Sequence, residues 1–106
     1  MAWIVLIAAG LLEVVWAFAM KRSEGFTRLA PSVVTVVAMV ASVGLLAYAM
    51  RSLPLGTAYM IWTGIGALGA FVAGVVFLGE DAGAMRLLAA GLILAGLILM
   101  KTASSA

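Results

Sequence analysis

Residues 2–20 read AWIVLIAAGLLEVVWAFAM, an apolar run with one carboxylate, Glu13, near its middle. As one helix, this run is long enough to cross a hydrocarbon layer of about 30 Å. A carboxylate at the centre of such a helix costs about 3 kcal/mol to insert, so it usually has a partner or a task. On the helical face of Glu13, small residues precede the acid, and Trp16 supplies an aromatic wall one turn later. We interpret Glu13 as the site of a small cation. The alternative is a protonated structural acid that is hydrogen-bonded inside a helix bundle.

The composition indicates that the natural solvent of the chain is lipid. Of its 106 residues, 67% are hydrophobic and only 9% are charged, which is too little polar surface for a small soluble domain. Cysteine and histidine are absent, which excludes disulfides, thiol chemistry and histidine-based catalysis, so neither an enzyme, a cofactor nor a metal site is expected. The net charge of +2 is small and scattered, and does not indicate nucleic-acid binding. A signal peptide is not indicated either, because residues 1–3 carry no basic side chain.

Four apolar runs alternate with short polar loops, which predicts an all-α membrane protein. We expect residues 1–106 to form one unit of four transmembrane helices, at about 2–20, 31–50, 55–79 and 84–101, with both termini on one side. Pro31 suits the first turn of the second helix, where its missing N–H costs nothing. The last apolar run, 87–100, is short, but the flanking Arg86 and Lys101 can extend it by snorkelling. Residues 102–106 are predicted to be a disordered tail.

The third run, residues 55–79, contains no charged residue. Tyr59 and Trp62 begin a line of residues on one helical face, in which small residues follow the aromatic ones. An interfacial aromatic belt would also explain the two aromatic residues. Two closely spaced glycines, Gly64 and Gly66, weaken the helix and predict a kink or hinge.

The second and fourth runs carry packing signals of two kinds. Hydroxyl side chains near one face of the second run, Ser32, Thr35 and Ser42, are expected to hydrogen-bond across helices. The fourth run has no polar side chain between its flanking charges. Its small residues Gly91, Ala95 and Gly96 predict a helix-packing surface.

A single buried acid in four short helices predicts a dimer. Four helices do not readily enclose a path, and a lone Glu13 would be left unpaired. A dimer places two copies of Glu13 in one chamber, where the like charges repel each other and the pair shares protons. A cation and protons would then compete for the same carboxylates. If only loaded states change orientation, this competition becomes exchange of the cation for protons.

Several segments together resemble the small multidrug resistance family, dimeric proton-coupled exporters of cations, and the likeness extends from Met1 to about Lys101. The segments are AWI at 2–4, LEVVWA at 12–17, GFTR at 25–28, PS at 31–32, LPLGTAY at 53–59 and WTGIGA at 62–67, with the glycines of the fourth helix. Trp16 three positions after Glu13, Lys21, and WTG at 62–64 are similar to the guanidinium-exporter subtype. One departure is Met60, where the family more often has a small residue, and we expect its flexible thioether to reshape the edge of the pocket.

The resemblance implies a role for each matching position. Glu13 would bind cation and protons. The remaining pocket residues would be Trp16, Ser42, Tyr59, Trp62 and Gly10, with Ser42 bonding near Glu13, Tyr59 reaching across the dimer and Gly10 leaving room for the acid. Gly64 and Gly66 would bend the third helix, and the fourth helices would form the dimer contact. The resemblance also implies a multi-pass protein of the bacterial inner membrane.

The function that follows is proton-coupled export of guanidinium and small substituted guanidinium cations by a homodimer. Export of quaternary ammonium drugs is an alternative, as is a non-transport membrane scaffold or half of a heteromeric pair. The loops at one side carry four basic residues, Lys21, Arg22, Arg28 and Arg86, against two, Arg51 and Lys101, at the other. This bias is slight, so we predict insertion in both orientations and an antiparallel dimer.

Overall fold

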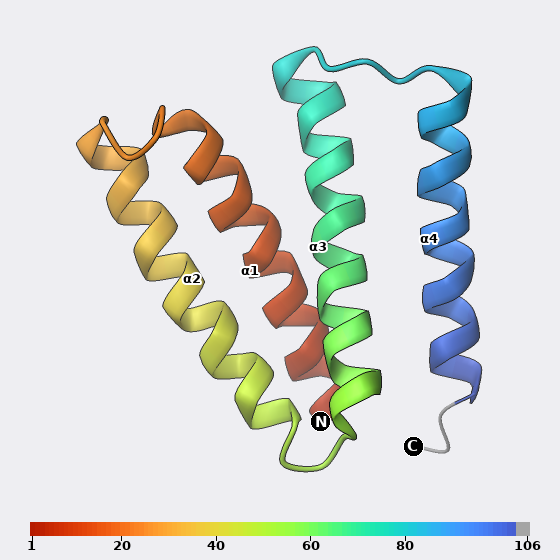
Figure 1. The fold of residues 1–106 in the computed structure, drawn as a ribbon. Helices are drawn as coiled ribbons and strands as arrows, with labels where there is room; N and C mark the ends of the chain where they lie inside the picture. The colour runs from red at the N-terminus through yellow and green to blue at the C-terminus, as the bar shows by residue number, and fades with distance from the viewer. Residues whose placement is uncertain (104–106) are drawn as a thin grey trace.

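The protein is an antiparallel array of four α-helices. The computed structural model describes residues 1–103, which contain α1 (Ala2–Arg22), α2 (Leu29–Ala49), α3 (Leu55–Leu78) and α4 (Ala84–Ala103) and no strand. Met1 and the C-terminal end of α4 lie at the same end of the array (Figure 1). The all-α fold class predicted from the four apolar runs is confirmed.

All four helices are long and apolar enough to cross a membrane. The 21 residues of α1 correspond to about 31 Å of helix, which matches a hydrocarbon layer. α2 begins at Leu29, two residues before the predicted start, and Pro31 falls in its first turn, where the missing N–H breaks no hydrogen bond. The predicted disordered tail is wrong for Thr102 and Ala103, which continue α4, and residues 104–106 lie outside the described part of the chain.

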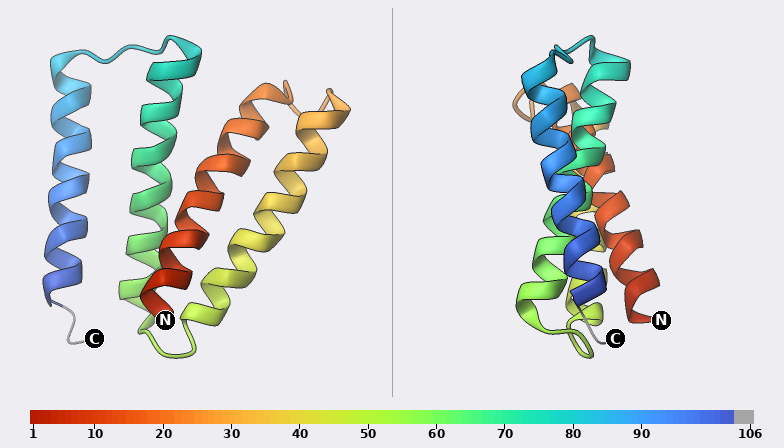
Figure 2. Two further views of the ribbon diagram at one scale, coloured as in Figure 1. Left: turned by 180° about the vertical axis from the view of Figure 1, so that it is seen from behind. Right: turned by 90° about the vertical axis from the view of Figure 1, so that its right-hand side faces the viewer.

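The helices form a slab rather than a closed bundle. The principal extents are 43 × 34 × 16 Å, so the protein is hardly more than one helix thick in its shortest direction. α1 packs against both α2 and α3, whereas α4 packs against α3. Figure 1 and the turned views of Figure 2 show α4 at the edge of the array. No residue of α4 is fully buried, so the surface of α4 that does not pack against α3 remains available to lipid or to a second protein.

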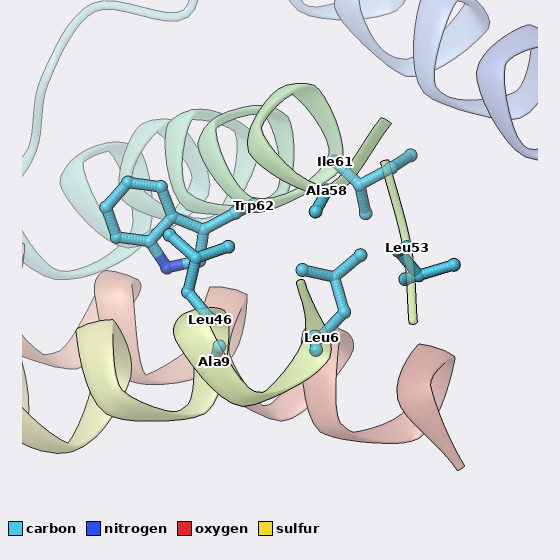
Figure 3. Packing of buried hydrophobic residues seen from close by; sticks show 8 residues of the cluster. Leu6, Ala9, Leu46, Leu53, Ala58, Ile61 and Trp62 are labelled. Atoms are coloured by element: carbon cyan, nitrogen blue, oxygen red, sulfur yellow. The ribbon is translucent and has the colours of Figure 1, made fainter. Parts of the chain in front are cut away.

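The apolar core lies toward the end of the array that bears the connection between α2 and α3. It consists of buried residues from α1, α2, α3 and this connection: Leu6, Ala9, Leu46, Ala49, Leu53, Ala58, Ile61 and Trp62. Figure 3 shows the Leu46 side chain of α2 extending toward the Trp62 ring of α3. Many core positions are alanines, which let the three backbones approach closely. Toward the other end, α1 and α2 lean away from α3 (Figure 1).

The loop between α1 and α2 is fixed by one buried serine. The Ser23 hydroxyl donates to the carbonyl of Met20 at 2.6 Å and accepts the N–H of Phe26 at 3.0 Å. Between these bonds the backbone turns through three consecutive residues with positive φ, Glu24, Gly25 and Phe26. The loop therefore holds α1 and α2 as tight antiparallel neighbours.

Candidate functional site

The carboxyl group of Glu13 lies at the seam between α1 and α3, directly against Gly66. A Cβ atom added to Gly66 would lie 2.8 Å from Glu13 Cγ and still nearer to the carboxyl carbon and Oε1. Glycine is therefore required at position 66 for the carboxyl group to occupy this place. Among residues 1–103, Glu13 Oε1 is buried and has no hydrogen-bond partner. A buried, unpartnered carboxyl oxygen in a membrane-spanning helix indicates a ligand or proton site.

A hydrogen-bonded chain joins three helices one turn before Glu13. Ser42 of α2 donates its hydroxyl proton to the carbonyl of Ala9 in α1 at 2.7 Å. The indole N–H of Trp62 in α3 donates to the same serine oxygen at 3.0 Å. The side chains of Ser42 and Trp62 are both buried. They hold the turn of α1 that leads into Glu13, because the carbonyl of residue 9 also accepts the helical bond from residue 13.

The two other aromatic candidates lie near this chain. The Tyr59 ring is half exposed and tilted against Trp62, with the ring centroids 5.5 Å apart. Trp16 packs partly buried against the apolar core, and within the described residues its indole N–H is buried without a hydrogen-bond partner. One face of α1 thus carries two buried polar atoms without a hydrogen-bond partner in the described residues. Glu13 supplies an acceptor oxygen and Trp16 supplies a donor N–H.

Two further glycines allow close helix contacts that do not involve the acid. A Cβ atom at Gly10 would meet Ile65 Cβ at 2.8 Å, so the space beside Gly10 is occupied by α3 rather than by the Glu13 carboxyl group. A Cβ atom at Gly64 would meet Leu97 of α4, with Leu97 Cγ at 2.9 Å. α3 is a continuous helix through Gly64 and Gly66, and hinge motion at these positions stays a prediction.

The three hydroxyl residues of α2 that were predicted to bond across helices differ in their hydrogen-bond partners. Ser32 and Thr35 donate to carbonyls of Arg28 and Pro31, one turn earlier in the chain, so the prediction that they bond across helices is wrong for both. A hydroxyl four residues after a carbonyl reaches it readily, and this local bond competes with a bond to another helix. Only Ser42 of the three crosses to a neighbour.

The small residues of α4 remain unpacked in the protomer. Gly91 and Ala95 are exposed, and a Cβ atom at Gly91 or Gly96 would meet nothing within 4 Å. Gly96 borders a groove of about 340 Å³ between α3 and α4, together with Met60. A second protein surface could approach α4 closely at these positions.

The sequence interpretation missed three features of the site. These are the contact of Gly66 with the acid, the filling of Gly10 by Ile65, and the use of the Ala9 carbonyl by Ser42. Each depends on the register between two helices. The sequence shows Gly66 as a glycine in an uncharged helix. Such a glycine indicates a bend in the helix as readily as a place where another group contacts the backbone closely.

Four membrane-spanning helices and, among residues 1–103, a buried, unpartnered carboxyl oxygen between α1 and α3 define a small multi-pass membrane protein with a polar site at its helix seam. Residues 1–93 match the sequence model of the family described as Small Multidrug Resistance protein. The chain belongs to this family, and it is a multi-pass protein of the bacterial inner membrane.

Bacterial relatives are similar to the chain over nearly its whole length. A protein of Yersinia pseudotuberculosis named guanidinium exporter is 64% identical over 104 residues, which cover 98% of this chain and 100% of the relative. Proteins with the same name from Citrobacter freundii and Escherichia coli are 58% and 59% identical over 101 residues, covering 95% of this chain and 96% of each relative. The family and the resemblance predicted from the sequence motifs are thereby confirmed.

Proposed function

We propose that this protein exports guanidinium and small substituted guanidinium cations from bacteria in exchange for protons. One observation carries the proposal: the carboxyl group of Glu13 is held against Gly66, with Oε1 buried and unpartnered among residues 1–103. The proposal is supported by relatives at 58–64% identity that are named guanidinium exporters. An exporter needs such a group, one that binds its cargo and its counter-ion in turn.

The chemistry of the carboxyl group matches both ligands. Guanidinium is planar and presents N–H donors in a fork that fits a carboxylate through paired, charge-assisted hydrogen bonds. A proton bound to Oε1 occupies the same atom and removes the charge that attracts the cation. Cation and proton therefore exclude each other at Glu13, and protonation on one side of the membrane releases the cation there.

A second copy of the chain would complete the site. The slab is 16 Å thick and Glu13 is only partly buried in it, so a single protomer does not enclose the acid. In the proposed antiparallel homodimer, two Glu13 side chains share one chamber and grip the cation from both sides. Tyr59 and Trp16 line this chamber, and the small residues of α4, including Gly91 and Ala95, form the dimer contact. Alternating access follows if only the cation-loaded and proton-loaded dimers reorient.

Ser42 and Trp62 act as positioning residues in this proposal. Their hydrogen bonds end on the Ala9 carbonyl, so they fix the rotation of α1 that aims Glu13 along the seam. Gly66 provides the space, and Gly10 and Ile65 fix how deeply α1 and α3 interlock. The acid is thereby held in place without a direct bond from the protomer, which leaves its oxygens to the ligands.

Transport into liposomes tests the proposal. Purified protein in liposomes with a proton gradient should accumulate guanidinium, and Glu13→Gln, which keeps the shape but loses the charge, should not. Lowering the pH on the side of cation binding should raise the KM for guanidinium, because protons occupy the site. Efficient transport of a bulky quaternary ammonium with none of guanidinium would favour drug export. Wild-type protein that moves neither cation would favour a scaffold.

A further inference from the structure

A small cavity with two charged side chains in its lining lies at the far end of the seam that holds Glu13. It has a volume of about 190 Å³ and lies between α1 and the C-terminal end of α3, where the first and third loops meet the helices. Lys21 and Phe18 of α1 line one side, and Gly74 and Glu80 line the other, with alanines between them. The ring of Phe18 lies edge-on against Phe77 of α3, with the centroids 5.9 Å apart.

The carboxylate of Glu80 is folded back into this cavity. α3 ends at Leu78, the φ of 69° at the following Gly79 reverses the chain, and the backbone N–H of Glu80 then donates to the carbonyl of Gly74 at 3.0 Å. A Cβ atom added to Gly74 would lie 2.8 Å from the carboxyl carbon of Glu80 and nearer to Oε1. The carboxylate therefore lies along α3, although the residue is exposed as a whole.

The geometry repeats that of the Glu13 site. In both places a carboxyl group occupies the space that a glycine of α3 leaves open, Gly66 for Glu13 and Gly74 for Glu80. Gly74 follows Gly66 by eight positions, and Lys21 follows Glu13 by eight positions. Eight residues rise by about 12 Å in a helix. Gly66 and Gly74, the two glycines that the carboxyl groups contact, are thus separated by about 12 Å along α3, the first near the buried Glu13 oxygen and the second at the mouth of the seam.

The charges at the mouth are opposed but not paired. Within residues 1–103, the structure records an ion pair within 4.0 Å only between Arg28 and Glu24, at 3.8 Å. Lys21 and Glu80 therefore face the same cavity without direct contact, which leaves the Glu80 oxygens open to a small cation. The carbonyl end of α3 adds negative potential at this place, since helix C-termini attract cations.

We propose that Glu80 forms an outer cation site, at which guanidinium is captured at the mouth of the α1–α3 seam, with Lys21 as a tethered competitor for the carboxylate. The inference rests on the proposed function of the Glu13 site. The negative charge of Glu80 at the entrance raises the local concentration of cations. The positive side chain of Lys21 then displaces the bound cation from Glu80. In an opposed dimer, each face of the membrane would carry one such mouth.

Transport kinetics give opposite expectations for the two residues. Glu80→Gln should raise the KM for guanidinium roughly fivefold, the effect of about 1 kcal/mol for one partly exposed charge contact, with little change in maximal rate. Lys21→Gln should lower the KM, because the competitor is gone, and Lys21→Arg should keep it. Asp81→Asn is the matched control, since it removes a neighbouring charge that does not line the cavity. An unchanged KM in Glu80→Gln, or shifts of the same sign in Glu80→Gln and Lys21→Gln, would overturn the proposal.

A binding measurement separates the outer site from the transport mechanism. Isotope-labelled Glu13→Gln protein, titrated with guanidinium chloride against choline chloride of equal ionic strength, should show saturable shifts of the Gly74 and Glu80 amide resonances. These shifts should vanish in the Glu13→Gln/Glu80→Gln protein, whose remaining spectrum confirms the fold. Absent shifts in Glu13→Gln protein would refute the outer site even if the wild-type protein transports guanidinium. Conversely, saturable shifts in a protein that does not transport would refute only the exporter proposal.

Discussion

Replacing Gly66 by alanine adds one methyl group at the place that the Glu13 carboxyl group occupies. The added Cβ would lie 2.8 Å from Glu13 Cγ and nearer to the carboxyl carbon and Oε1. An ordinary carbon contact is about 3.5–4.0 Å, so the carboxyl group must retreat by roughly 1 Å or more. The end of a flexible side chain can make this movement, and the helix backbone need not follow.

The effect on function should therefore be large while the effect on stability stays small. A misplacement of about 1 Å in a binding constellation can lower the rate about 100-fold. Alanine in a helix interior is favoured over glycine by about 0.5–1 kcal/mol, which offsets the cost of moving the acid. We expect Gly66→Ala to lose roughly two orders of magnitude in guanidinium transport while its thermal stability in detergent stays near that of the wild-type protein.

The assay is proton-driven guanidinium uptake into liposomes at matched protein density, with thermal unfolding measured in parallel. Gly44→Ala is the control, because a Cβ atom at Gly44 of α2 would meet nothing within 4 Å, and its transport should equal that of the wild-type protein. Full transport by Gly66→Ala would refute the reasoning, because the carboxyl group would then function away from its observed place. Equal losses in both variants would point to helix flexibility instead.

Four other outcomes follow from the same structure. Glu13→Gln should abolish proton-driven transport while the dimer persists in detergent, and Glu13→Asp should retain part of the activity with a shifted pH optimum. Ser42→Ala leaves the Trp62 N–H without its acceptor and should destabilise the protein by about 1–3 kcal/mol and slow transport, whereas Thr35→Val, which removes only a local bond, should do neither. Gly10→Ala should lower stability by about 1–3 kcal/mol through overpacking against α3, visible as a lower unfolding temperature. A reporter fused to the C-terminus should be found on both sides of the membrane, and a single orientation would contradict the opposed dimer.

The helices themselves were predictable because lipid imposes a simple rule on sequence. An apolar run of about 20 residues must become a helix that satisfies its own backbone, and all four runs did so. Helix ends were less predictable, since ends lie where the chain meets water and are set by local hydrogen bonds. The bonds around Ser23 and the first turn before Pro31 extend α1 and α2 beyond the apolar runs.

The site was predictable as a list of side chains but not as an arrangement. Glu13 is conspicuous from its burial cost alone, and the hydroxyl of Ser42 was expected near it. Which glycine the Glu13 carboxyl group contacts was not predictable. The register between α1 and α3 decides whether Gly10, Gly64 or Gly66 lies beside the acid. That register is set by side-chain volumes such as that of Ile65, which fills the space beside Gly10 and lies far along the chain.

The bonds from Trp62 to Ser42 and from Ser42 to Ala9 have a mechanical consequence. They tie α1, α2 and α3 at one level, between the core and the acid, and the helices have fewer ties where α1 and α2 lean away. In the proposed exporter this level would act as a pivot, so that a tilt that narrows the array on one side would widen it on the other. Opening toward one face of the membrane and closing toward the opposite face would then be a single movement.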